Sequence, residues 1–248
     1  MQERGLSPRT IKYAVSVLHS ALEQAVRWNM LQRNPAALVE LPRQVRKEMQ
    51  AFSPEEAARF LAAVENDRLG TLFRFAIMTG MRPEEYLGLR WKDIDLTTGV
   101  VTIQRTVYAK KGGGWAFGEP KTARSRRSIP LSSPLVQTLK EHKRTQAEER
   151  LKAGAKYQDN GLVFATSEGT PHLLRNIIRR HFRPALERAG LPTTMRLYDL
   201  RHSCATLLLA AGEHPLEQAG AAGAVCGGEA DRRGRRPAGK GSLRRRGL

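Results

Sequence analysis

The amino-acid sequence predicts a mainly α-helical fold with a small antiparallel β-sheet. Most of the chain up to residue 212 falls into segments whose apolar side chains recur every three or four positions, and several begin with a serine–proline cap, a pattern typical of helices. One stretch, residues 100–107, is instead rich in β-branched side chains and precedes a glycine-rich turn, as expected of a strand that enters a hairpin.

The first helix is predicted to begin at Ser7-Pro8, a cap residue followed by proline at the first helical position. An apolar stripe expected to be buried follows it, formed by Ile11, Val15, Leu18, Leu22 and Val26. Residues 1–38 are too few for an independent core, so they are interpreted as the end of a helical domain. The polar, basic residues 39–51 are predicted to be a linker.

A larger domain, residues 52–218, is expected to open with three helices. The first follows a capping box, Ser53-Pro54-Glu55-Glu56. The second covers about residues 70–79, and the third starts at Arg82-Pro83. Together their apolar residues are expected to form one side of a core.

The sheet is predicted from the segments that come next. Residues 100–107 form the first strand, residues 115–119 return as a second, and residues 127–131 form a short third one. A long polar helix follows, capped by Ser132 or Ser133 and running to about residue 151.

Two further helices complete the pattern. Residues 172–189 are predicted to be one amphipathic helix, with a core face of Leu174, Ile177, Ile178, Phe182 and Leu186. Its other face carries Arg175, Arg179 and Arg183 at four-residue spacing. Residues 199–211 are expected to form the last helix, which Gly212 ends.

The chain is strongly basic, with a formal net charge of +18. Residues 219–248 hold eight Lys or Arg and two Asp or Glu, so +12 of this charge belongs to the rest of the chain. A surplus of this size favours a polyanionic partner, most often nucleic acid. Residues 219–248 are mostly Gly, Ala and Arg and are predicted to be disordered. Two interpretations of this tail remain: a basic DNA-contacting extension, or the product of a frameshift in a GC-rich gene.

Other functional classes find no support in the composition. The sequence has no apolar run long enough for a membrane span and no signal-peptide core. Its two cysteines, Cys204 and Cys226, suggest neither a metal cluster nor a disulfide framework, and they fit a reducing cytoplasm. Neither a metal nor a nucleotide cofactor is expected, because no ligand cluster or phosphate-binding glycine loop is present.

Three segments carry the residue types that phosphoryl transfer on a DNA backbone requires, namely cations for the phosphate oxygens and a general acid for the leaving oxygen. They are residues 79–95 (TGMRPEEYLGLRWKDID), residues 119–131, which hold EPKT and RRSIPL, and residues 197–206 (LYDLRHSCAT). In this order and spacing they resemble the two arginine boxes and the hairpin lysine segment of tyrosine recombinases, the phage integrase family. The resemblance covers roughly residues 5–216.

The resemblance implies a role for each matching residue. Arg82 and Arg201 would clamp the scissile phosphate, and Lys121 would be the general acid. Glu85 would hold the geometry around Arg82. Tyr198 stands where the family usually has a histidine; a phenol can donate a hydrogen bond there but is a poor base at neutral pH.

Each of these residues also has a purely structural interpretation. Arg82 could be a surface residue near a helix start, and Lys121 a solvated lysine. Arg201 lies in the first turn of a predicted helix, whose positive end repels cations, so it requires an anion. That anion is either a phosphate or a carboxylate such as Asp199.

A second set of arginines is predicted to contact the DNA backbone. The helix face of Arg175, Arg179 and Arg183 has charge of one sign only, which favours contact with DNA. The alternative is that these arginines are simply solvated on a surface helix. The set also includes the residues that flank Lys121, which are Arg124, Arg126 and Arg127.

Two family elements have no counterpart in this sequence: the segment that follows the second arginine box and the helix with the nucleophilic tyrosine. The last tyrosine is Tyr198. We therefore expect a double-stranded-DNA-binding protein of the integrase and recombinase lineage that does not cleave DNA. It is expected to act alone or beside other recombinase protomers. The alternatives are a non-enzymatic DNA-binding remnant or regulator, and, less favoured, a type IB topoisomerase-like enzyme.

Overall fold

The computed structural model describes residues 5–43, 49–119 and 126–212. The chain divides into two units, Met1–Met49 and Gln50–Leu248, and each is described by itself. Lys121, Arg124 and the tail predicted to be disordered lie outside the described residues.

The first unit consists of one long helix and a short one, α1 (Pro8–Arg27) and η1 (Pro35–Leu38). The hydroxyl of Ser7 accepts a hydrogen bond from the Thr10 backbone N–H at 3.2 Å, so the predicted cap is confirmed. The predicted burial of the apolar stripe is right for Ile11 and wrong for Leu18, which is 52% exposed. The physical reason is that α1 packs within this unit on η1, which is too short to cover the stripe.

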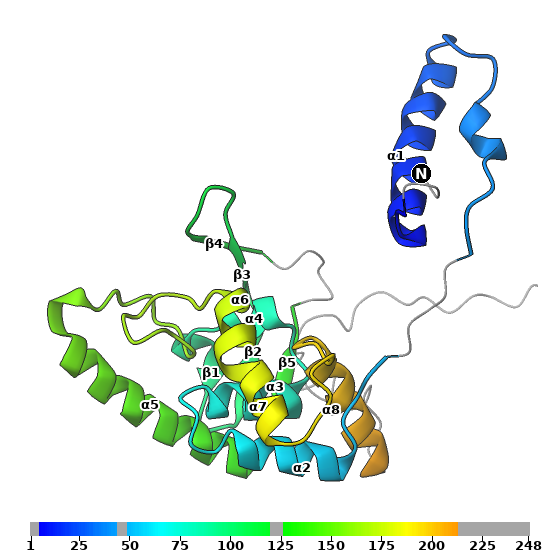
Figure 1. The fold of residues 1–248 in the computed structure, drawn as a ribbon. Coiled ribbons are helices and arrows are strands. Elements are labelled where there is room, and N and C mark those ends of the chain that lie inside the picture. The colour runs from blue at the N-terminus through cyan, green and yellow to red at the C-terminus, as the bar shows by residue number, and fades with distance from the viewer. Residues whose placement is uncertain (1–4, 44–48, 120–125, 213–248) are drawn as a thin grey trace, which may run out of the picture. The chain divides into compact units, whose positions relative to one another are not determined.

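The second unit holds the other helices around a common core (Figure 1). They are α2 (Pro54–Ala63), α3 (Gly70–Thr79), α4 (Pro83–Leu87), η2 (Trp91–Asp93), α5 (Ser133–Ala153), η4 (Gly154–Lys156), α6 (Leu174–Ile177), η5 (Ile178–Phe182), α7 (Arg183–Arg188) and α8 (Asp199–Ala210). The capping box of α2 is confirmed, because Ser53 and Glu56 exchange hydrogen bonds through their side chains and backbones. The rings of Phe60, Phe73 and Phe182 meet in the core at centroid distances of 5.6–5.9 Å.

The strands form two small antiparallel sheets. β1 (Ile94–Asp95), β2 (Val100–Thr102) and β5 (Ser128–Pro130) make one sheet in the order β1-β2-β5, and β3 (Thr106–Ala109) and β4 (Trp115–Gly118) make a separate hairpin. The prediction of one continuous strand over 100–107 is therefore wrong. Between its halves, Arg105 turns toward Asp93, with 3.7 Å between Nη2 and Oδ1, and the chain leaves one sheet for the other.

The long polar helix α5 is confirmed, and one buried polar residue attaches it to the rest of the unit. Gln146 accepts a hydrogen bond from the Trp91 indole N–H at 2.6 Å. Its amide group donates to the carbonyl oxygens of Leu162 and Val163. These bonds explain how a polar side chain can be buried at the surface of α5 that faces the core.

The helix predicted over 172–189 is divided into α6, a π-helical turn (η5) and α7. Pro184 has no N–H to donate to the carbonyl four residues earlier, and this favours a wider turn at that point. The buried residues consequently follow a spacing of five and then four, namely Ile177, Phe182 and Leu186. Leu174, predicted to be buried, is 36% exposed.

The predicted fold class, mainly α with small antiparallel sheets, is confirmed. Gly212 ends the last helix as expected, with φ of 78° and its N–H donating to the Leu209 carbonyl. Within the described residues, no helix combines the length and the apolar character needed to cross a membrane.

Candidate functional site

Two arginines from distant parts of the chain bind one buried carboxylate, and the charge of a third arginine acts on them. Arg82 lies at the start of α4, Arg127 directly precedes β5, and Arg201 lies in the first turn of α8. The carboxylate belongs to Glu85, whose side chain is 2% exposed. We call these four residues the arginine cluster.

Within the arginine cluster, Arg82 and Glu85 are brought together by the first turn of α4. Pro83 at the first position of α4 places Glu85 one turn after Arg82. One oxygen of Glu85 accepts a hydrogen bond from the Arg82 backbone N–H at 3.0 Å, and the other accepts from Nη1 of the Arg82 side chain at 2.9 Å. The predicted role of Glu85 beside Arg82 therefore has a direct geometric basis.

The long-range part of the arginine cluster is Arg127. Its Nη1 and Nη2 donate to the two oxygens of Glu85 at 3.3 and 2.9 Å. Burial by itself would raise the pKa of Glu85, but the hydrogen bonds from Arg127 and from Arg82 outweigh it and hold this pKa below its ordinary value. Glu85 is thus a stable buried anion, and it balances one of the three positive charges.

Arg201 does not pair with Asp199. Its Nη1 donates to the carbonyl of Gly80, which ends α3 in the left-handed region with φ of 57°. Asp199 instead accepts from Arg196, through Nη2 at 2.7 Å and Nε at 3.1 Å. Asp199 is therefore not the partner of Arg201. The partner of Asp199 is thus an arginine three residues earlier in the chain, and Asp199 is not available to Arg201.

The charges of the three arginines influence one another. Burial lowers the pKa of Arg201, and the charges of Arg82 and Arg127 lower it further. Gly80 has little space for a side chain, because a Cβ there would lie 3.1 Å from Sγ of Cys204. The α3–α8 contact that carries Arg201 is therefore tight, and it holds a half-buried cation beside two others.

Tyr198 lies at the edge of this group, immediately before α8. It is 38% exposed and packs edge-on against His202 with 5.8 Å between ring centroids. Hydrogen bonding to Glu85 does most to raise the pKa of Arg82, burial opposes this, and the neighbouring Tyr198 hydroxyl adds a smaller rise. The part in phosphate binding expected for Tyr198 stays a prediction.

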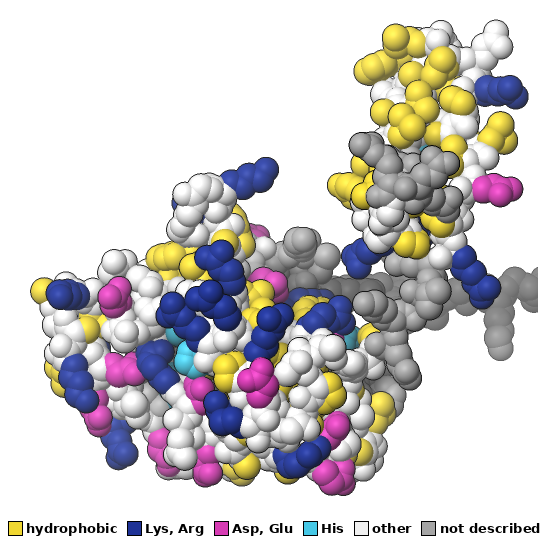
Figure 2. Space-filling model, in the orientation of Figure 1, with side chains coloured by type: hydrophobic (Ala, Val, Ile, Leu, Met, Phe, Trp, Pro, Cys, Tyr) yellow, Lys and Arg dark blue, Asp and Glu magenta, His cyan; other side chains and the backbone are white. Residues whose placement is uncertain are grey.

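The remaining predicted residues divide into two groups. Arg126 lies at the surface, where it pairs with Glu119 at 3.0 Å. Arg175, Arg179 and Arg183 are all exposed on α6, η5 and α7, and we call them the arginine patch. Figure 2 shows Lys and Arg side chains gathered over α6 and the segment that follows it. Sequence reasoning missed that Arg127 pairs with Glu85 and that Arg201 binds the Gly80 carbonyl. Neither contact leaves a signal in the local sequence.

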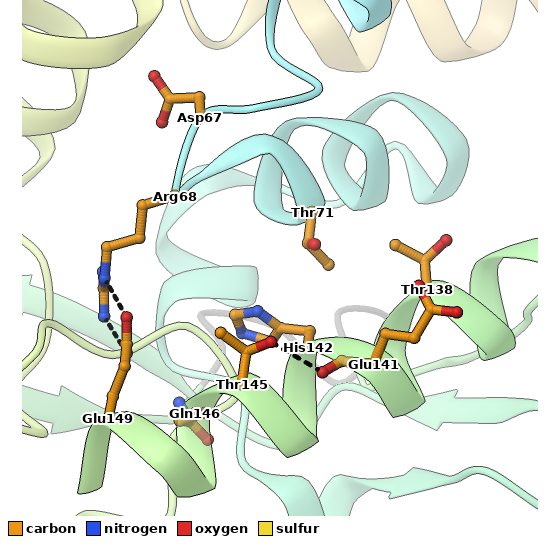
Figure 3. Close-up of a pocket in the computed structure, with 9 residues that line it drawn as sticks. All are labelled: Asp67, Arg68, Thr71, Thr138, Glu141, His142, Thr145, Gln146 and Glu149. Atoms are coloured by element: carbon orange, nitrogen blue, oxygen red, sulfur yellow. Dashed lines mark hydrogen bonds and ion pairs between the residues drawn. The ribbon is translucent and has the colours of Figure 1, made fainter. Parts of the chain in front are cut away.

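A polar cavity of about 260 Å³ lies elsewhere, between the start of α3 and α5 (Figure 3). Arg68 bridges it by two hydrogen bonds to Glu149, at 2.7 and 2.8 Å. Asp67, at the same cavity, accepts from His181 in the π-helical turn at 2.7 Å. Because these side chains are hydrogen-bonded to one another, the cavity is best explained as a network that ties α3, α5 and η5 together.

Acidification should destabilise the fold through His172, whose Nε2 lies 3.1 Å from the Ala165 carbonyl oxygen. Burial lowers the pKa of His172 to about 4, and the nearby Arg68 charge adds to the effect. The ordinary value is about 6.5, so the unfolded chain takes up this proton before the folded chain does. Stability from this group is complete above pH ~6.5 and falls by about 2–3 kcal/mol as the pH drops to ~4.

Denaturant unfolding at neutral pH and near pH ~4.5 measures this effect. The His172→Gln variant should lose less stability between the two conditions than the unchanged chain. Equal losses in both proteins would assign the acid sensitivity to other groups.

The phage integrase family matches residues 50–217 of the chain. A tyrosine recombinase XerC-like protein of Caldanaerobacter subterraneus subsp. tengcongensis is 34% identical over 229 residues, covering 86% of this chain and 58% of the relative. The ICEBs1 integrase of Bacillus subtilis is 30% identical over 220 residues, covering 86% and 57%. The chain thus spans less than two thirds of the length of these curated relatives.

Solved structures show the same fold at lower sequence identity. The Tn1549 transposon integrase in complex with a circular intermediate DNA has a TM-score of 0.72 at 22% identity, covering 88% of this chain and 72% of that one. The lambda integrase bound to DNA has a TM-score of 0.56 at 16% identity, covering 81% and 65%.

Proposed function

This chain belongs to the phage integrase family, the tyrosine recombinases, and from that premise we propose that it binds double-stranded DNA with a backbone phosphate at the arginine cluster. The observation that carries the proposal is the pairing of Arg82 and Arg127 with one buried carboxylate, with the charge of Arg201 close by. Three cations and one anion leave a surplus of two positive charges. A phosphate diester, which carries one negative charge, would balance one of the two.

The chemistry of the arginine cluster suits a phosphate in a strand-transfer reaction. Arg82 and Arg201 would hold the non-bridging oxygens, where negative charge builds up as phosphorus is attacked. Tyr198 would donate a hydrogen bond to the same group. Lys121 would protonate the leaving 5′-oxygen as the general acid. The lineage of the chain, DNA integration and site-specific recombination, uses this reaction.

We further propose that the 248-residue chain by itself forms non-covalent complexes and does not cleave DNA. It has five tyrosines, the last of which is Tyr198. Tyr86 is 1% exposed, and burial raises the pKa of its hydroxyl, so it is a poor nucleophile. Tyr198 would lie beside the bound phosphate as a hydrogen-bond donor, and a covalent link would require a nucleophile other than these two tyrosines.

One experiment tests both parts of this proposal. Binding of a labelled duplex is followed by fluorescence anisotropy over a salt series, and a nicked duplex is then incubated with the chain and run on a denaturing gel. We expect affinity to fall steeply with salt, with a slope of about −0.9 for each neutralised phosphate, and no covalent adduct. A slope near zero would refute DNA-backbone binding, and a denaturation-resistant adduct would show that this chain contains a working nucleophile.

The same samples separate the alternative activities. A type IB topoisomerase-like enzyme would relax supercoiled plasmid, which we do not expect. A regulator that occupies recombination sites would bind a defined repeat more tightly than unrelated duplex, without cleavage.

A further inference from the structure

Glu85 has more hydrogen-bond donors than its own helix supplies. Its carboxylate accepts four bonds, of which two come from Arg82 and two from Arg127. The side chains of the two arginines differ in exposure, at 41% for Arg82 and 20% for Arg127. Arg127 is therefore the more enclosed partner, and Arg82 is the one that solvent or a ligand reaches.

Arg127 is held in place by the sheet rather than by the helix that carries Glu85. Its backbone carbonyl accepts from the Ile103 N–H at 2.9 Å, and the residues that follow it form β5, which pairs with β2. The guanidinium thus projects from a fixed backbone across to α4. This ion pair joins parts of the chain that are 42 residues apart.

The number of partners matters because Glu85 is a buried anion. When a buried ion pair loses one partner, the remaining buried charge must be balanced by the other groups around it. Without Arg127, the guanidinium of Arg82 would be the remaining side-chain partner of Glu85. The N–H groups of Arg82 would then bind the Glu85 carboxylate and would be less available to a ligand.

We propose that Arg127 is a positioning residue, which satisfies Glu85 through two hydrogen bonds and so leaves the guanidinium of Arg82 available to a DNA phosphate. This inference rests on the proposed function, because it assigns Arg127 a part in the same phosphate site. It differs from the prediction that Arg127 contacts the DNA backbone directly. Arg127 acts through Glu85 and Arg82.

A double-mutant cycle on duplex binding distinguishes the two roles. Arg82→Ala should weaken binding about tenfold, and Arg127→Met by a similar factor. If Arg127 acts through Arg82, the double variant should be no more than about twofold weaker than either single variant. If the two losses multiply, and Arg127→Met makes the salt slope less steep by about 0.9, Arg127 is a direct phosphate contact and the proposal is wrong.

Rescue gives a second and independent test. In the Arg127→Met background, Glu85→Gln removes the buried charge that holds Arg82, so affinity should return to within about twofold of the unchanged chain. Lack of rescue would overturn the proposal. Arg150→Met is the matched control, since it removes one positive charge from a surface ion pair with Asp159 and should leave binding unchanged.

Two measurements show whether a negative result comes from an unfolded variant, from a chain that does not bind DNA, or from an error in this inference. Thermal unfolding shows whether Arg127→Met is folded; if it is not, Arg127→Lys, which keeps the charge but loses the paired geometry, takes its place in the cycle. NMR titration of the Glu85 carboxyl carbon without DNA should show its pKa rising in the variant. An unchanged Glu85 pKa overturns the positioning role, whereas a chain that binds no duplex while this pKa rises overturns the proposed function alone.

Discussion

Replacing Arg175, Arg179 and Arg183 together by alanine should weaken binding to double-stranded DNA by about a hundredfold at physiological salt. All three side chains of the arginine patch are exposed on the segment from α6 to α7. Each contact with a phosphate releases about 0.9 counterion, which corresponds to roughly a fivefold change in affinity at this salt concentration. The salt slope of binding should become less steep by about 3. Fluorescence anisotropy over a salt series measures both quantities.

The control is a triple variant with the same change in charge on another helix. Lys140, Arg144 and Lys152 are exposed on α5, and their replacement by alanine should leave the affinity within about threefold of the unchanged chain. Equal losses in both triple variants would mean that total charge, rather than the arginine patch, determines binding. Neither variant should unfold the protein, because the substituted side chains lie at the surface.

Phe182→Ala should lower the free energy of unfolding by about 3–5 kcal/mol. The ring is fully buried, with its centroid 5.7 Å from that of Phe60 and 5.9 Å from that of Phe73. Its removal leaves a cavity that neighbouring aromatic rings cannot fill without leaving their own positions. Chemical denaturation followed by circular dichroism measures the loss.

A nearby leucine provides the comparison for Phe182. Leu174→Ala removes an apolar side chain from the same segment of the chain, but Leu174 is 36% exposed and should cost less than about 1 kcal/mol. A similar loss in both variants would contradict the burial that the structure assigns. The experiment also tests the π-helical turn, because an unbroken helix over 172–189 would change which residues reach the core.

Much of the fold could be predicted because its signals are local. The serine–proline starts of α1 and α2, the glycine that ends α8 and the apolar spacing within each helix all act over one or two turns. The errors occurred where a distant contact or an interruption changed a local pattern. Residues 100–107 divide between two sheets, and Leu174, predicted to be buried, is 36% exposed at the start of a helix that a π-helical turn interrupts.

The candidate site shows the same division. Arg82 and Glu85 are three residues apart at a helix start, so their pairing follows from helix geometry. Asp199 also pairs three residues away, with Arg196, although the sequence equally allowed Arg201 as its partner. The choice between two arginines near one carboxylate depends on which side of α8 packs against α3, and that packing places Arg201 on the Gly80 carbonyl.

The helical character of the chain, its surplus of positive charge and the ordered segments typical of the phage integrase family can all be recognised from the order of the amino acids. These properties depend on composition and on spacing within a few residues, where backbone geometry alone decides which side chains are neighbours. The packing of helices and strands, in contrast, determines that Arg127 shares Glu85 with Arg82 and that Arg201 binds the Gly80 carbonyl. Contacts across 42 or more residues depend on how helices and strands pack. A buried carboxylate pairs with the cations on the elements that this packing places beside it.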